Sequence, residues 1–154
     1  MTRYRVTVVD TNGCPTAVVS ADPAIDDAGP QWRPMLDEVW GLLRQRPDLW
    51  AGGHNVMVYA SRPGGGARLV EAGVQVTGPF GPVGRVHPSS LPGTQTATTV
   101  GPLSDIGAVH DAVQAWSVGE ARRLTGSFWE VYGDPDPETG RVDVTVHWEL
   151  GSGG

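Results

Sequence analysis

The feature that most constrains the fold is an internal repeat, in which strand and helix patterns recur in the same order. Thr16–Ser20 (TAVVS) resembles Thr96–Val100 (TATTV), and each segment is followed by one helix pattern and two strand patterns. The strand after each helix contains a matching Val-Tyr pair, Val58-Tyr59 in the first copy and Val131-Tyr132 in the second. The repeat predicts an α+β fold built from duplicated strand–helix–strand–strand units with pseudo-twofold symmetry, an antiparallel-rich sheet, two helices and a central groove.

Both copies are expected to form a single domain over residues 1–150, with repeat halves of about 1–80 and 81–150. In the first half a helix is predicted over 34–46, and strands over Tyr4–Asp10, Thr16–Ser20, Asn55–Ala60 and Arg68–Thr77. In the second half a helix is predicted over 105–116, capped by Ser104, and strands over Thr96–Val100, Phe128–Gly133 and Arg141–Leu150. Residues 151–154 (GSGG) are expected to be a disordered tail.

Composition excludes several classes of function. The net charge is −6, and the eleven basic residues are arginines scattered along the chain, so direct nucleic-acid binding is not expected. The single cysteine excludes an intrachain disulfide and a thiolate metal cluster. The four histidines have no metal-binding spacing, and neither a metal nor another cofactor is expected. No apolar run is long enough to cross a membrane and no leader opens the chain, which predicts a cytoplasmic protein.

One strand of the second half contains an acidic residue, Glu130, among aromatic and branched apolar residues. Phe128 and Tyr132 share its strand face, and Trp129 and Val131 lie on the other face. A carboxylate in such a strand is costly to bury unless a partner hydrogen-bonds or neutralises it. The structural alternative is a surface glutamate on an edge strand.

The two copies together predict where a ligand would bind. The faces that carry Val56 and Val58 in one copy, and Trp129 and Val131 in the other, suit the apolar stripes of the helices and are expected to form the core. The opposite faces would then meet as a groove lined by Met57, Tyr59, Phe128, Glu130 and Tyr132. The first copy has Met57 where the second has Glu130. Because an acid needed only for the fold would be expected in both copies, this asymmetry favours a function for Glu130.

Three further residues have two interpretations each. Trp32 precedes the first predicted helix, and either packs in the core or reaches over the groove as a lid. Trp148 alternates with His147 on the last strand and either belongs to an ordinary half-buried face or helps to close the groove. His110, in the second helix, is either a solvated or partly buried helix residue or a residue at the edge of the pocket.

The second half resembles the GyrI-like, or bacterial transcription activator effector-binding, domain. The resemblance rests on the Thr-Thr-Val-Gly-Pro run at 98–102, the helix ending at Trp116, the Trp-Glu-Val-Tyr strand at 129–132 and the DPDPETG turn at 134–140. It implies a stand-alone bacterial domain whose groove binds bulky, flat, often cationic hydrophobic molecules, as in multidrug binding. By the same resemblance Glu130 lies at the groove floor with Tyr132 beside it. Leu103 departs from the pattern, because the family often has an aromatic residue there, so this wall of the pocket is expected to differ.

Three functions remain open from the sequence. The first is binding of a hydrophobic small molecule, cationic or aromatic, in a groove with Glu130 at its floor. The second, implied by the resemblance because some GyrI-like proteins have a similar pocket and are hydrolases, is hydrolysis of reactive cyclopropane-type compounds, with Glu130 activating water and Tyr132 assisting. The third is an interaction protein that inhibits a macromolecular partner. The same residues serve all three, so the sequence does not separate them.

Overall fold

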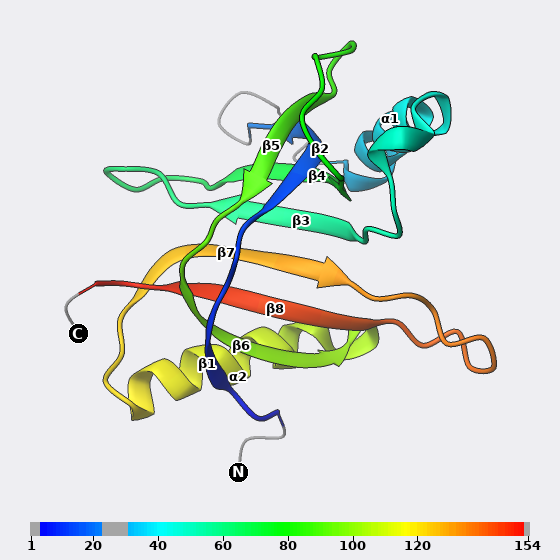
Figure 1. The fold of residues 1–154 in the computed structure, drawn as a ribbon. Coiled ribbons are helices and arrows are strands. Elements are labelled where there is room, and N and C mark those ends of the chain that lie inside the picture. The colour runs from blue at the N-terminus through cyan, green and yellow to red at the C-terminus, as the bar shows by residue number, and fades with distance from the viewer. Residues whose placement is uncertain (1–3, 23–30, 153–154) are drawn as a thin grey trace.

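The computed structural model describes residues 4–22 and 31–152, which form one antiparallel sheet of eight strands and two α-helices (Figure 1). This confirms the predicted α+β class. The first half contains β2 (Cys14–Ala21), α1 (Trp32–Gln45), β3 (Asn55–Ala60) and β4 (Leu69–Gln75). The second half contains β6 (Gln95–Pro102), α2 (Ile106–Gly119), β7 (Leu124–Tyr132) and β8 (Asp143–Leu150). Single turns of 3₁₀ helix lie at Pro47–Leu49 and Leu103–Asp105.

The two halves meet where β3 pairs with β7, and the pairing register reveals the pseudo-twofold axis. Met57 lies directly opposite Glu130, and Tyr59 lies opposite Phe128. The sequence repeat also makes Met57 and Glu130 equivalent, so the axis passes between these two residues. Outward from the axis the order is the same on both sides, β3-β4-β2 in one half and β7-β8-β6 in the other.

Two short strands complete the sheet at its edges: β1 (Thr7–Asp10) lies beside β6, and β5 (His87–Leu91) lies beside β2. β1 pairs with β6 and β5 pairs with β2 in one continuous antiparallel register, from Thr7 opposite Thr98 to Val18 opposite His87. The segments β1–β2 and β5–β6 therefore pair side by side as two long antiparallel strands, and the sheet curls back on itself (Figure 1). β5 was not predicted, because Pro88 and two serines hide its strand pattern.

The helices lie on the face of the sheet opposite to the one predicted. α1 packs on β2 and β4, and α2 packs on β6 and β8, on the face that also carries Met57 and Tyr59. The predicted helix partners Val56 and Trp129 instead form a separate cluster with Leu91 of β5, which belongs to the pair of long strands that covers the other face of β3 and β7. The prediction was wrong because this strand pair supplies an apolar cover that the repeat alone does not reveal.

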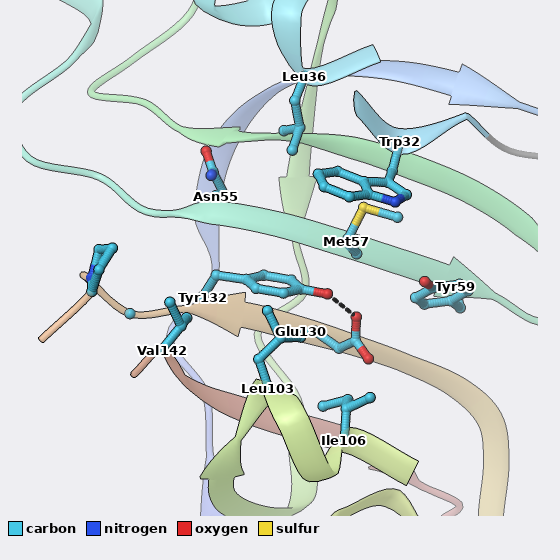
Figure 2. A pocket seen from close by; sticks show the side chains of 12 residues that line it. Trp32, Leu36, Asn55, Met57, Tyr59, Leu103, Ile106, Glu130, Tyr132 and Val142 are labelled. Atoms are coloured by element: carbon cyan, nitrogen blue, oxygen red, sulfur yellow. Dashed lines mark hydrogen bonds between the residues drawn. The ribbon is translucent and has the colours of Figure 1, made fainter. Parts of the chain in front are cut away.

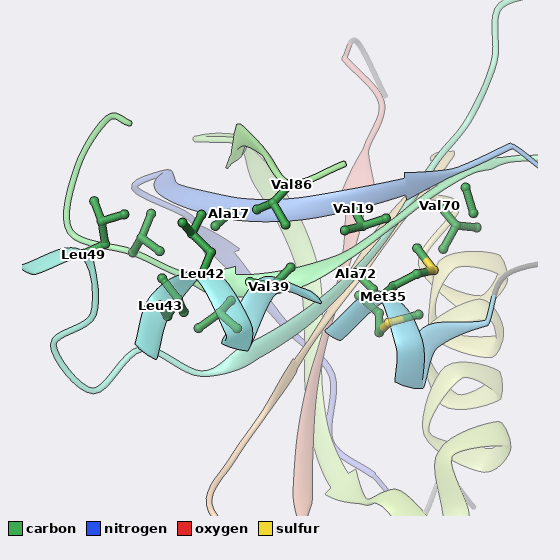
Figure 3. Packing of buried hydrophobic residues seen from close by; sticks show 14 residues of the cluster. Ala17, Val19, Met35, Val39, Leu42, Leu43, Leu49, Val70, Ala72 and Val86 are labelled. Atoms are coloured by element: carbon green, nitrogen blue, oxygen red, sulfur yellow. The ribbon is translucent and has the colours of Figure 1, made fainter. Parts of the chain in front are cut away.

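Each helix is held by an apolar stripe on small and β-branched strand residues. In the first half the buried stripe Met35, Val39, Leu42 and Leu43 covers Ala17, Val19, Val70 and Ala72 (Figure 3). In the second half Val109 and Val113 pack on Ala97, Val144 and Val146. Complete burial of each such aliphatic side chain stabilises the fold by about 1.5–3 kcal/mol. Because the helices rest on the outer strands, the central strands β3 and β7 are left uncovered between them.

Several boundaries differ from the predictions. Ser104 does not cap α2: it lies in the 3₁₀ turn, and α2 begins at Ile106 with no side-chain cap. Trp32 is the first residue of α1 and does not precede the helix. In the predicted tail, the backbone N–H of Gly151 donates a hydrogen bond to the carbonyl of Arg123 at 2.8 Å, while residues 153–154 lie outside the described residues.

Candidate functional site

A cavity of about 490 Å³ lies between α1 and α2, over the uncovered strands β3 and β7 (Figure 2). Its wall is mostly apolar, and the polar groups that reach it come from one amide, one carboxylate and two phenols. The lining residues are Trp32, Leu36, Asn55, Met57, Tyr59, Leu103, Ile106, Glu130, Tyr132, Gly133, Pro135 and Val142. The size and composition are those of small-molecule sites.

The lining follows the pseudo-twofold axis. Each helix presents its first residue to the cavity, Trp32 from α1 and Ile106 from α2. Each central strand contributes a tyrosine, Tyr59 and Tyr132, at equivalent positions of the repeat. The cavity is therefore a property of the duplicated fold, and its chemistry depends on where the two halves differ.

Six of the eight residues predicted to bind a ligand line this cavity: Glu130, Tyr132, Tyr59, Met57, Trp32 and Leu103. Phe128 and Trp148 do not line it. They stack behind Tyr59, with ring centroids 4.6 Å apart between Tyr59 and Phe128 and 4.2 Å apart between Phe128 and Trp148. A glycine with φ of +99°, Gly126, lies at the register shift of β7 that precedes Phe128. Trp148 therefore supports the floor of the cavity and does not close it.

Sequence reasoning missed several wall residues, among them Leu36 and Ile106 on the helices, and Asn55 on β3. The two helix residues were assigned to the core, because an apolar stripe does not distinguish a residue at a groove from one beneath it. Asn55 carries an identifiable polar role, since its side-chain oxygen accepts a hydrogen bond from the Trp40 indole at 2.9 Å.

Glu130 is buried on the cavity floor, with 5% of its surface exposed. The Tyr132 hydroxyl donates to Oε1 at 2.6 Å, which Figure 2 shows, and Nε2 of His110 lies 2.6 Å from Oε2. Across residues 4–22 and 31–152, no arginine forms a salt bridge with this carboxylate. The edge-strand alternative is therefore wrong, because β7 lies at the centre of the sheet and Glu130 is shielded from solvent.

His110 links Glu130 to Trp148, and its role exceeds that of a partly buried helix residue. The indole N–H of Trp148 donates to Nδ1 of His110 at 2.9 Å. Because an indole nitrogen only donates, Nδ1 must accept, and in the neutral imidazole the proton lies on Nε2 and points to Glu130. Alignment of α2 on α1 places His110 at the position of Leu36, the fifth residue of each helix; this alignment is the signal that could have identified it.

The two tyrosines of the cavity have raised pKa values, in part because of the Glu130 carboxylate. Burial, reinforced by the nearby charge of Glu130, raises the pKa of Tyr59 to about 12. Burial, the same charge and the hydrogen bond to Glu130 raise the pKa of Tyr132 further. Both phenols therefore remain protonated at neutral pH, and Tyr132 acts as a hydrogen-bond donor.

The described residues carry neither a metal-binding cluster nor a membrane-spanning helix. No cluster of three or more His, Cys, Asp or Glu side chains is placed to hold a metal ion there. No described helix has both the length and the apolar character needed to span a membrane.

Comparison with known proteins identifies the fold. No family model matches the chain, and no curated protein matches it in sequence. Among solved structures, the chain resembles EcmrR in a complex with DNA, with a TM-score of 0.74 and 13% identity over 97% of this chain and 58% of that chain. The isolated EcmrR C-terminal domain gives a TM-score of 0.67 and 14% identity over 97% and 98% of the two chains.

Two further structures have the same fold. SAV2435 bound to tetraphenylphosphonium gives a TM-score of 0.64 and 9% identity, over 97% of this chain and 94% of that one. A hydrolase from Listeria innocua gives 0.60 and 8% identity, over 96% and 92%. The chain therefore has the fold of GyrI-like effector-binding domains, as the sequence resemblance predicted. It spans only 58% of the EcmrR chain in the DNA complex.

Proposed function

We propose that this protein binds bulky hydrophobic cations in the cavity between α1 and α2. The observation that carries the proposal is a buried carboxylate, Glu130, whose described partners, Tyr132 and His110, are a neutral phenol and an imidazole held as a donor. Two neutral donors satisfy the oxygens but leave the charge uncompensated in an apolar cavity. A ligand cation supplies the missing charge, and in this low-dielectric setting the attraction is stronger than in water.

The rest of the wall suits the apolar body of such a ligand. The rings of Tyr59 and Tyr132 flank the carboxylate and offer stacking and cation–π contact. Trp32 stands at the cavity with half of its surface exposed, so it is available to cover a bound molecule. The volume of about 490 Å³ fits a compound with several rings. SAV2435, which has the same fold, was crystallised with a ligand of this class, tetraphenylphosphonium.

The test compares two ions of nearly the same outline and opposite charge, tetraphenylphosphonium and tetraphenylborate, by isothermal titration calorimetry. The protein is expected to bind the cation and to reject the anion. Glu130→Gln retains the shape and removes the charge, so cation affinity should fall by about 1–3 kcal/mol, roughly 5- to 150-fold. Glu149→Gln is the matched control, because Glu149 lies on β8 outside the cavity and bonds Thr125. Equal affinity of wild type and Glu130→Gln for the cation would contradict the proposal.

Hydrolysis is the second candidate, since a Glu–Tyr pair lies at the cavity floor and a Listeria innocua protein of the same fold is described as a hydrolase. Two points favour binding. Both carboxylate oxygens already accept short hydrogen bonds, and the titratable groups that line the cavity are Glu130, Tyr59 and Tyr132, with both phenols protonated. A hydrophobic ester or cyclopropane compound should be recovered unchanged after long incubation with stoichiometric protein. Its conversion by wild type and not by Glu130→Gln would establish the hydrolase instead.

A further inference from the structure

We propose that Trp148, which does not line the cavity, sets the charge of the site by holding His110 in its neutral form. Trp148 is then a positioning residue that makes the cavity selective for cations. The selectivity rests on the function proposed above, whereas the protonation state of His110 can be measured without any ligand.

The first step is the hydrogen bond between Trp148 and His110. The indole has one N–H and no acceptor, and it donates to Nδ1 of His110 at 2.9 Å. A second proton on the imidazole would have to occupy Nδ1, where it would face the indole N–H. Protonation of His110 therefore requires this hydrogen bond to break and leaves two donors opposed in a site largely shielded from water.

The second step is that Trp148 cannot turn away to admit the proton. Its side chain is 4% exposed and stacks on Phe128 at a centroid distance of 4.2 Å. The imidazole of His110 also contacts both rings edge-on, with centroids 4.9 Å from Phe128 and 5.7 Å from Trp148. The donor is thus fixed in place by close packing on both sides.

The third step is that the imidazole would otherwise be a good candidate for protonation. Its Nε2 lies 2.6 Å from Oε2 of Glu130, and a carboxylate at this distance normally favours imidazolium. The resulting pair would be neutral and would remove the attraction for a cationic ligand. The hydrogen bond from Trp148 opposes this outcome and keeps the net charge of the pair at −1.

The other charged groups near His110 do not replace this effect. On β7, Tyr132 is protonated and neutral, and on α2 the neighbouring Asp111 is exposed. Ahead of β4, the guanidinium of Arg68 lies 5.1 Å from the Phe128 ring and 5.9 Å from the Trp148 ring. A positive charge there also disfavours imidazolium, but it lies beyond the rings and makes no contact with the imidazole.

The experiment replaces only the donor. Trp148→Phe retains an aromatic ring to stack on Phe128 and removes the N–H. Nitrogen-15 NMR of the histidine side chains, without ligand, reports the tautomer and the charge of His110 at pH 7. In wild type, His110 should be neutral with its proton on Nε2. In Trp148→Phe, Nδ1 no longer faces an indole N–H, and a second proton there should make the ring imidazolium.

Cation binding supplies the second readout. At pH 7 the affinity of Trp148→Phe for tetraphenylphosphonium should be about tenfold lower than that of wild type, because imidazolium at His110 neutralises the pair. Trp129→Phe is the matched control, because Trp129 is equally buried on β7 but stacks on His147, on the other face. It should leave both readouts of the Glu130 site as in wild type.

The outcomes separate the two proposals. At pH 7, imidazolium at His110 in wild type, or a neutral His110 in Trp148→Phe, would overturn the role of Trp148. The wild-type spectrum decides the first point even if the variant does not fold. If tetraphenylphosphonium does not bind but His110 behaves as expected, the role of Trp148 in fixing the charge stands and the proposed function fails.

Discussion

The two halves of the molecule share one fold, and three of the equivalent positions at which their side chains differ decide the chemistry of the cavity floor. The second half has a hydrogen-bonded chain from Trp148 through His110 to Glu130, and the first half has the apolar residues Val74, Leu36 and Met57 at those positions. Met57 and Glu130 face each other across the axis, and Val74 and Trp148 pair with the equivalent residues Asn55 and Phe128.

This difference shows that the fold does not need the polar chain. The first half buries its equivalent positions with Met57 at 6% exposure and Val74 fully buried. A buried polar network that apolar side chains can replace costs desolvation energy and adds little net stability. The second half therefore retains it for a purpose other than folding, and we infer that this purpose is the charge of the cavity floor.

The largest expected effect is a loss of folding stability when one residue of the hydrogen-bonded chain from Trp148 to Glu130 is replaced. Glu130→Met, which copies the first half, removes the acceptor of both His110 and Tyr132. Each of the two donors left without a partner costs about 1–3 kcal/mol, so the free energy of unfolding should fall by about 2–6 kcal/mol. The triple variant Glu130→Met/His110→Leu/Trp148→Phe also removes the donors of His110 and Trp148 and leaves only the Tyr132 hydroxyl without its acceptor, so it should recover about half of this loss. Urea unfolding monitored by circular dichroism measures both.

The comparison between the halves would be broken if the triple variant were as unstable as the sum of its single changes. That result would mean that the second half depends on the polar chain for its packing. Met57→Leu is the control in the first half, because a swap of similar volume usually costs less than about 1.5 kcal/mol.

The repeat is the part of the fold that the sequence predicted well. The match of Val58-Tyr59 with Val131-Tyr132, 73 residues later, made two strands equivalent and made Met57 the counterpart of Glu130. The structure places these strands side by side at the centre of the sheet, with Met57 opposite Glu130. The tyrosine partners confirm the correspondence, since Tyr59 pairs with Val70 and Tyr132 with Val144.

Two features depended on long-range contacts that no local pattern contains. Strand alternation separated the two faces of β3 and β7 correctly. Which face the helices cover could not be predicted, because the paired segments β1–β2 and β5–β6 already cover the face of Val56 and Trp129. His110 was missed because its two hydrogen-bond partners, Glu130 and Trp148, lie on strands 20 and 38 residues further along the chain.

A second histidine, His147 on the other face of β8, makes the stability of the second half depend on pH in a way that the first half does not share. Burial lowers the pKa of His147 from 6.5 to about 4, and its Nδ1 lies 3.0 Å from the hydroxyl of Thr98. The equivalent residue in the first half is Gly73, opposite Val18. Between pH 6.5 and pH 4 the unfolded chain binds a proton at His147 that the folded protein does not bind, so stability falls as the pH decreases through this window.

The expected contribution of His147 between pH 7 and pH 5 is about 1–2 kcal/mol, allowing for the partial exposure of the ring. His147→Asn, which cannot titrate, should reduce the loss of unfolding free energy over this interval by that amount. His54→Asn, at a more exposed site paired with Asp134, is the control. An unchanged pH dependence in His147→Asn would show that the ring is protonated in the folded protein.

The smallest expected effect concerns the two tyrosines that the repeat makes equivalent. Burial and the Glu130 charge raise the pKa of Tyr59 to about 12, and Tyr132 is raised further because it also donates directly to Glu130. Removal of the charge in Glu130→Gln makes both phenolates less unfavourable, so both pKa values should fall. The fall should be larger at Tyr132, which loses an ionic acceptor, and less than about one unit, or 1.4 kcal/mol, at Tyr59.

The two tyrosines can be followed separately by fluorine NMR of fluorotyrosine-labelled protein, in which the phenols ionise at lower pH. The variants Tyr59→Phe and Tyr132→Phe assign the two fluorine signals. Equal shifts at the two positions would mean that the carboxylate acts on both halves alike, and that the hydrogen bond between Tyr132 and Glu130 does not distinguish them.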